Sequence, residues 1–178
     1  MSTIMSNYDL LNKPPKDFTE YGELLYTKSL DILSLSQLST GGTTASLPGT
    51  RYAGHVYPRD HGYATRAFIA ANDFDRAEKA LDFILTCELD PTGVMFQRYD
   101  EHGKNASYKP PQIDGNAQTL LSLATFCART KDILLLKKHK KHIAQLLEGI
   151  NKKTSHFKNG SLVQSINGII EYSAFEAG

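Results

Sequence analysis

Apolar residues recur every three or four positions along five stretches of the chain, a spacing that places them on one face of an α-helix. The five predicted helices cover about 18–38, Asp60–Asn72, a segment starting at Phe74, a segment starting at Asp114 and about 132–150. Their periodic apolar positions include Tyr21, Leu25, Ile32, Leu35, Leu38, Ala64, Ala67, Phe68, Ala71, Ala77, Leu81, Ile84, Ala117, Leu120, Leu121, Ala124 and Cys127. The pattern predicts an all-α fold.

Turn-forming residues separate these helices in two ways. Asn72 is expected to end one helix in the left-handed conformation, and the next helix begins at once, so the two form a tight hairpin. By contrast, 39–58 is long and rich in Gly, Pro and Thr, and 100–111 is a polar loop that ends in two prolines. Gly41 and Gly42 are expected to form the C-cap of the first helix.

Three further segments complete the pattern. The residues 94–99 follow an Asp-Pro-Thr-Gly turn and are expected to be extended, as are 161–166. The residues 169–178 have the pattern of a helix that is beginning. Long loops thus alternate with tight corners, which predicts antiparallel hairpins whose long loops and short strands lie at one end. Functional residues usually collect on such loops.

Two of the long loops end in a similar sequence motif, in which a proline and a short spacer precede an aspartate and a helix. Pro58 excludes helical backbone at Tyr57, and Asp60 and Asp114 are both predicted to be helix N-caps. An N-cap aspartate stabilises a helix by about 1 kcal/mol even when it has no other function. Each aspartate, taken alone, therefore has a purely structural explanation.

The composition is that of an ordinary folded domain, with 40% hydrophobic and 22% charged residues among 178. A net charge of +1 gives no reason to expect nucleic acid or an anionic membrane as a partner. The basic run 137–142 lies within a helical pattern, so it is interpreted as a solvated helix face. No signal-peptide pattern opens the chain and no run approaches the ~20 apolar residues of a membrane span, so a cytoplasmic protein is expected.

The sequence predicts neither a metal site nor a cofactor. Cys87 and Cys127 fall in the apolar phase of helices, so they are expected to be unpaired core residues. His55 and His61 have no further ligand at metal spacing. The sequence also has no glycine-rich phosphate-binding turn and no dinucleotide fingerprint.

Beside the structural explanation of the two aspartates, the polar side chains at the two helix starts are suited to bind a sugar. Arg59 and Asp60 stand side by side at the first, and Gln112 and Asp114 follow each other closely at the second. A guanidinium beside a carboxylate offers donors and acceptors to a polyhydroxylated ligand. Tyrosines nearby could stack on sugar faces or simply cover helix ends; they are Tyr52, Tyr57, Tyr63, Tyr99 and Tyr108. The lack of Trp, the commonest sugar platform, counts against this interpretation.

Three segments resemble, in order and spacing, the N-terminal half of the glucoamylase-like enzymes of glycoside hydrolase family 15. They are Thr40–Ser46, Tyr57–Ala64 and Lys109–Leu120, and the likeness covers most of the chain from about residue 18. The resemblance implies an (α/α)6 toroid of helical hairpins. The chain would hold a polar leader, 1–17, and about the first half of the toroid, 18–178.

The resemblance also implies a pocket for the end of an α-glucan or oligosaccharide. Arg59 and Asp60 would bind the hydroxyls of the terminal glucose. Tyr57 would stand where the family commonly has Trp. Gln112 and Asp114 would line or support the same pocket.

The reaction implied is inverting exo-hydrolysis, which needs one carboxyl as general acid and another as general base. The family's acid lies in a Trp-Glu-Glu motif after the fifth helix. The corresponding place here is 168–172, which makes Glu171 the candidate acid, with Glu176 as the second choice. The family's base lies far beyond Gly178, so the chain is interpreted as a fragment that is inactive alone.

Two alternatives stay open. A non-catalytic glucan-binding or regulatory domain of the phosphorylase kinase type would share the Arg-Asp and Gln-x-Asp-Gly motifs. A helical-repeat scaffold without a ligand is less well supported, because no phrase recurs at a fixed period. The sequence makes no prediction of oligomeric state.

Overall fold

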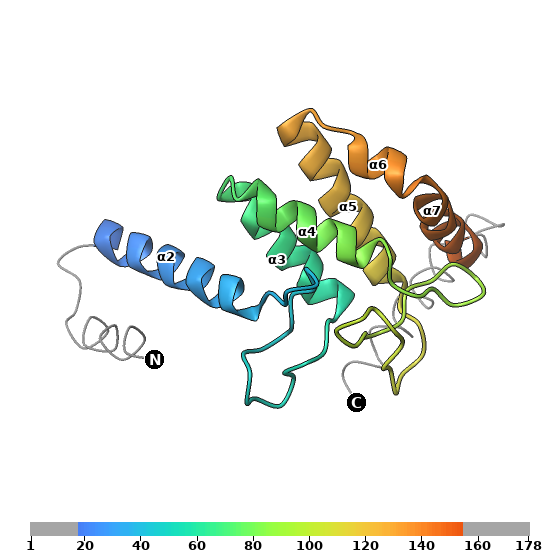
Figure 1. The fold of residues 1–178 in the computed structure, drawn as a ribbon, viewed down its shortest axis with the longest axis horizontal. Coiled ribbons are helices and arrows are strands. Elements are labelled where there is room, and N and C mark those ends of the chain that lie inside the picture. The colour runs from blue at the N-terminus through green and yellow to red at the C-terminus, as the bar shows by residue number, and fades with distance from the viewer. Residues whose placement is uncertain (1–17, 155–178) are drawn as a thin grey trace. The chain divides into compact units, whose positions relative to one another are not determined.

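The computed structural model describes residues 18–154, and within them the fold is all-α, as predicted (Figure 1). The chain divides into two compact units, 1–34 and 35–178. The helices are α2 (Phe18–Ser36), α3 (Pro58–Ala70), α4 (Phe74–Ile84), α5 (Ile113–Thr130), α6 (Leu134–Lys138) and α7 (Lys140–Thr154). In the second unit α3, α4 and α5 pack against one another, and α7 packs on α5.

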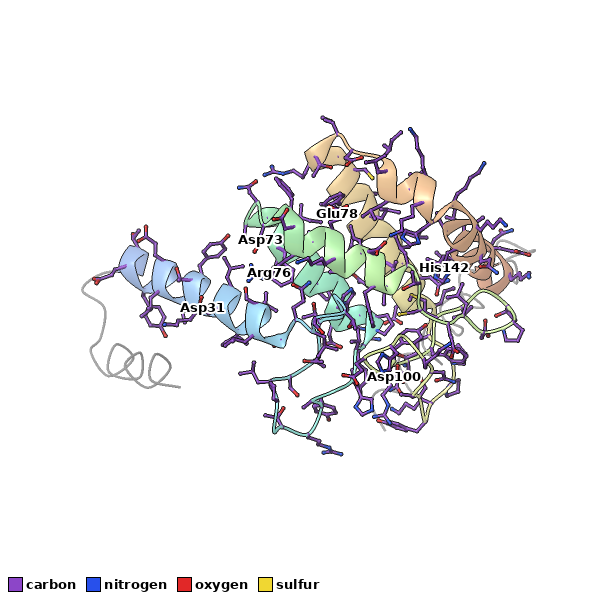
Figure 2. The ribbon with its side chains drawn as sticks, in the orientation of Figure 1. Asp31, Asp73, Arg76, Glu78, Asp100 and His142 are labelled. Carbon is purple, nitrogen blue, oxygen red and sulfur yellow. The ribbon has the colours of Figure 1, made fainter. Side chains whose placement is uncertain are left out.

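The corner between α3 and α4 is the tight hairpin that the sequence predicts. Asn72 adopts the left-handed conformation, with φ 61°. The N–H of Asn72 donates to the carbonyl of Ile69 at 3.1 Å, and that of Asp73 to Phe68 at 2.9 Å, which is the Schellman pattern of a helix end. Asp73 then accepts from the backbone of Arg76 as the N-cap of α4, and Figure 2 shows the two side chains together at this helix start.

The two long loops of the second unit, 37–57 and 85–112, lie at the same end of the helices, and the tight corners lie at the other end (Figure 1). Val56 and Tyr99 join the loops by a reciprocal pair of backbone hydrogen bonds, each 2.9 Å long. The predicted short strands are wrong for the described residues, which contain only isolated antiparallel bridges. Single bridges are enough here because helices, not a sheet, carry the packing.

Two helices begin earlier than the sequence predicts. Neither Asp60 nor Asp114 is an N-cap: Tyr57 and Gln112 are, and neither uses its side chain to cap. Pro58 occupies the first turn of α3, where a missing N–H costs nothing and the fixed φ suits the helix. Tyr57 is extended, with φ −96° and ψ 120°, as expected before a proline.

The predicted helix 132–150 is instead two helices, α6 and α7, which meet at His139. His139 has φ −102° and ψ 19°, and its buried ring lies 2.7 Å from Asp82 of α4. The interpretation of 137–142 as a solvated face is therefore only partly right. The lysines of this run are exposed, whereas His139 is buried and His142 is half-buried.

The glycine pair Gly41-Gly42 does not cap α2, which ends at Ser36, but forms a turn beyond it. Leu38 donates to the carbonyl of Gly42 and Gly41 donates to Leu38, at 2.7 and 2.9 Å. A Cβ on Gly41, whose φ is 100°, would lie 2.2 Å from the carbonyl oxygen of Lys79. The turn is therefore pressed against α4, and only glycine fits there.

The buried face of α5 differs from the predicted apolar stripe. Leu121 is 53% exposed, and Ala117 and Ala124 are exposed as well. The buried positions are mostly small or polar: Gly115, Asn116, Thr119, Ser122, Leu123 and Phe126. Small side chains let α3 approach α5 closely. The Oγ of Ser122 donates to the carbonyl of Gly62 at 3.1 Å across this contact.

His61 fastens the first long loop to two helices. Its Nδ1 accepts the backbone N–H of Thr43, and its Nε2 lies 3.0 Å from the carbonyl oxygen of Ala80, to which it donates. Both ring nitrogens are satisfied only in the neutral imidazole. Burial accordingly lowers the pKa of His61 from 6.5 to about 4.

Cys87 and Cys127 are free. Cys87 is buried, as predicted, but it lies beyond the end of α4 at Ile84 and not in a helix, and Cys127 on α5 is only half-buried. Burial, and then the nearby Asp100 carboxylate, raise the pKa of the Cys87 thiol well above its ordinary value. The leader 1–17, the predicted strand 161–166, the predicted helix 169–178 and the candidate acids Glu171 and Glu176 lie outside the described residues.

We predict that His61 makes the stability of the protein pH-dependent. The unfolded imidazole takes up a proton below about 6.5 and the folded one only below about 4, so the free energy of unfolding should fall by about 3 kcal/mol over that window. Chemical denaturation at several pH values measures this slope. His61→Gln should make the slope smaller, and the part that remains is due to His142, whose pKa burial likewise lowers to about 4. His102→Gln, at an exposed loop histidine, is the matched control. An unchanged slope in His61→Gln would contradict the assignment.

Candidate functional site

The N-terminal ends of α3 and α5 meet at the loop end of the second unit, where their side chains form an ion pair. The Nε of Arg59 donates to Oδ2 of Asp114 at 2.5 Å, and the Nη2 of Arg59 contacts the same carboxylate oxygen. The two side chains keep 40% and 35% of their surfaces exposed. The pair thus joins the two motifs of the sequence, 55 residues apart, and reaches solvent where a ligand can approach.

A glycine makes this meeting possible. A Cβ on Gly115 would lie 2.9 Å from Cβ of Pro58 and 3.3 Å from Cβ of Met95. One turn further into α3, a Cβ on Gly62 would lie 2.8 Å from Cβ of Gln118. The Gly of the Gln-x-Asp-Gly motif therefore packs directly on the Pro of the Pro-Arg-Asp motif.

Tyr57 and Asp60 lie on either side of Arg59 in the sequence, with Tyr57 at the end of the first long loop and Asp60 on α3. Asp60 is exposed in the first turn of α3, where the helix dipole favours a carboxylate. Tyr57 is half-buried, and its ring meets that of Tyr52 edge-on, with ring centres 6.1 Å apart. Arg59 and Asp60 are adjacent in sequence, and the carboxylate that the structure pairs with Arg59 is that of Asp114.

Gln112 is buried at the start of α5, with only 7% of its surface exposed. It therefore supports the exposed residues of the site from within the protein. Its backbone N–H donates to the carbonyl of Met95 at 2.9 Å, and its carbonyl accepts from Gly115 at 3.2 Å. These bonds tie the start of α5 to the second long loop. Of the five residues expected to bind sugar, Gln112 is the most buried. Among the nearby tyrosines, Tyr99 is fully buried and so does not offer its ring to a ligand.

Asn116, which the sequence analysis did not single out, holds the second loop in place. It is fully buried, and its Oδ1 accepts from the backbone of Met95 at 2.8 Å. Its Nδ2 donates to the carbonyls of Gly93 and Leu146 at 2.8 and 3.0 Å. One amide side chain thus joins α5, the loop and α7. Its position directly after the Gln-x-Asp-Gly motif is the only signal of this role in the sequence.

Asp100 organises the outer part of the same loop, where Figure 2 labels it. Its Oδ1 accepts the backbone N–H groups of Lys104 and His102, each at 2.9 Å. The hydrogen bond from Lys104, ahead of that from His102, holds the pKa of the Asp100 carboxyl below its ordinary value. The predicted polar loop is therefore a defined turn, built around one carboxylate.

Arg98 is the second residue that the sequence analysis missed. Its guanidinium lies over the ring of Tyr108, 4.7 Å from the ring centre, and its Nη1 donates to the hydroxyl of Tyr57 at 3.4 Å. No local pattern predicts this contact, because it depends on how the two loops fold together. Arg98 connects the second loop to the residue that caps α3.

The described residues contain neither the pattern of a metal-ligand cluster nor that of a membrane-spanning helix. No group of three or more His, Cys, Asp or Glu side chains within 18–154 is arranged to hold a metal ion. Among the helices of that range, none has the length and apolar character to cross a bilayer. The chemistry available at the helix starts is that of hydrogen bonds, an ion pair and exposed aromatic rings.

Solved structures of glycosidases resemble the chain in fold at low sequence identity. No protein-family model matches it, and no curated protein matches it by sequence. A wild-type glycosidase structure matches with a TM-score of 0.66 and 18% identity, over 78% of this chain and 43% of that one. A glycosidase with a tyrosine-to-phenylalanine substitution matches with a TM-score of 0.66 and 16% identity, over 87% and 50%. The chain thus spans half or less of these structures and shares the fold of that part.

We predict that Gly115→Ala disrupts the site and destabilises the protein. The added methyl would force Pro58 and Met95 away, which should lower the free energy of unfolding by about 1–3 kcal/mol and weaken the Arg59–Asp114 pair. Chemical denaturation measures the loss. Gly22→Ala, where no atom lies within 4 Å of the new Cβ, is the matched control and should not destabilise. Equal stability of Gly115→Ala and the wild-type protein would contradict the packing argument.

Proposed function

We propose that the protein is a glycosidase of the glucoamylase type, similar to glycoside hydrolase family 15, that acts in the cytoplasm on the end of an α-glucan or oligosaccharide. The observation that carries the proposal is the meeting of the two motifs. Arg59 contacts Asp114 and Pro58 packs on Gly115, on adjacent helices whose fold is shared with solved glycosidases.

In this proposal the exposed ends of the two helices bind a terminal sugar. Arg59 donates hydrogen bonds to sugar hydroxyls, and Asp114 fixes its guanidinium in place, because two nitrogens of Arg59 contact one carboxylate oxygen. Asp60 accepts hydrogen bonds from hydroxyls, and Tyr57 presents its ring and hydroxyl beside them. Gln112 supports the start of α5 from its buried position.

The proposed reaction is inverting exo-hydrolysis of an α-glucosidic bond. Glu171 is the proposed general acid, which gives its proton to the oxygen of the leaving sugar. A carboxylate from residues beyond this chain is the proposed base, which takes a proton from the attacking water at roughly 6.5–9.5 Å from the acid. Water adds at the anomeric carbon from the opposite face, so the configuration inverts.

A second candidate is a non-catalytic glucan-binding domain. The observation that favours it is in the sequence, because the segment 168–172 has neither the Trp nor the second Glu of the family's Trp-Glu-Glu motif. The binding residues Arg59, Asp60 and Asp114 would serve this function equally well. The two candidates differ only in whether the bound sugar is hydrolysed.

We predict that the full-length protein releases glucose from maltotriose and that Glu171→Gln lowers kcat on the order of 10²–10⁴-fold, the usual contribution of a general acid. Glucose release measures the rate, and calorimetry should show that the variant still binds. Glu148→Gln, at an exposed glutamate of α7, is the matched control. If kcat falls in Glu176→Gln and not in Glu171→Gln, Glu176 is the general acid. Binding without hydrolysis by the wild-type protein would favour the second candidate.

A further inference from the structure

A single arginine connects the two long loops at the proposed sugar site. Arg98 belongs to the loop 85–112, and its Nη1 donates to the hydroxyl of Tyr57, the last residue of the loop 37–57. The guanidinium carbon of Arg98 also lies over the Tyr108 ring, 4.7 Å from the ring centre. One side chain therefore sets where two tyrosines stand relative to each other.

Arg98 is itself held firmly by its own loop. Its Nε donates to the carbonyl of Ala106 at 2.6 Å. Its backbone N–H donates to the hydroxyl of Ser107 at 3.0 Å, and that hydroxyl donates back to the carbonyl of Arg98 at 3.1 Å. A guanidinium fixed in this way is a rigid support, because its planar fork leaves little rotational freedom.

The Tyr108 ring is supported but not buried, since 66% of the residue is exposed. A tyrosine that is fixed by a cation on one face and open on the rest offers an apolar surface with a hydroxyl at its edge. The C–H faces and hydroxyls of a sugar ring match such a surface. Tyr57, half-buried beside Tyr52, presents its hydroxyl to the same arginine.

We propose that Arg98 is a positioning residue of the sugar site, which holds the Tyr108 ring and the Tyr57 hydroxyl in the geometry that binds carbohydrate. The inference rests on the proposed function of this site. Arg98 acts through the two tyrosines and does not itself need to contact the sugar.

Arg66 provides a matched comparison within the same unit. It also lies over a tyrosine ring, with its guanidinium carbon 4.7 Å from the centre of Tyr63. It is likewise fixed by hydrogen bonds, to Gln118 and Ser122 at 2.6 and 2.9 Å. Arg66 bridges α3 and α5 but makes no contact with the two long loops in these bonds. A loss of stability from removing a stacked arginine should therefore be alike at the two positions.

The test measures binding of maltotriose to the full-length protein by calorimetry, with Tm measured for every variant. Arg98→Ala should weaken binding on the order of tenfold, as expected for loss of a cation–π contact and a hydrogen bond. Arg98→Lys, which restores the charge over Tyr108 but not the planar fork, should recover part of the affinity. Arg66→Ala and Arg66→Lys, the matched controls, should both bind like the wild-type protein.

A double-mutant cycle shows whether Arg98 acts through Tyr108. Tyr108→Ala should weaken binding, and adding Arg98→Ala to it should weaken binding further but by less than Arg98→Ala does alone, because only the contact with the Tyr57 hydroxyl is left to lose. Fully additive effects of Tyr108→Ala and Arg98→Ala on the free energy of binding would overturn the inference. Wild-type affinity in both Arg98→Ala and Arg98→Lys would do the same, and neither result would overturn the proposed function. Absence of maltotriose binding by the wild-type protein would overturn the proposed function and the inference with it.

Discussion

The candidate site depends on how closely the first turns of α3 and α5 approach each other. Pro58 and Gly115 are in contact, and any side chain at position 115 would separate them. This approach places the guanidinium of Arg59 on the carboxylate of Asp114. A surface ion pair alone is worth little in water. Here the packing of Pro58 on Gly115 sets the distance between the two helices, and the ion pair with Asp114 fixes the orientation of the Arg59 side chain.

The loops that surround the site are held by buried polar side chains with satisfied hydrogen bonds. Neutral His61 ties the first loop to α3 and α4, and Asn116 ties the second loop to α5 and α7. Such fully bonded groups specify one arrangement, because any other would leave buried donors or acceptors unpaired. Long loops that would otherwise be free to move therefore present fixed residues at the helix ends.

Local sequence signals predicted the helices and their corners well. Asn72 and Asp73 form the hairpin that their chemistry predicts, and Pro58 makes Tyr57 extended. The capping prediction failed at Asp60 because proline itself is a good first residue of a helix, so the N-cap of α3 lies three residues earlier, at Tyr57. The break at His139 was missed because the contact of its ring with Asp82 is tertiary and overrides a continuous helical pattern.

The candidate site was predicted only in part, for a similar reason. Arg59, Asp60 and Asp114 were recognisable from motif chemistry, but the pairing of Arg59 with Asp114 depends on two helices 55 residues apart in sequence. The small and polar face of α5 gives no hydrophobic signal, so hydropathy pointed to the exposed Leu121 instead. Arg98 and Asn116 act through contacts between loops and helices that no local pattern records.

The central claim is that the Arg59–Asp114 pair forms part of a sugar site, and a double-mutant cycle on maltotriose binding tests it most directly. We predict that Arg59→Gln and Asp114→Asn each weaken binding on the order of tenfold or more, and that their effects are not additive. The pair Asp73–Arg76 on α4, with nitrogen and oxygen 2.5 Å apart, is the matched control, and its neutral variants should bind normally. Wild-type affinity in both single variants at positions 59 and 114 would contradict the account.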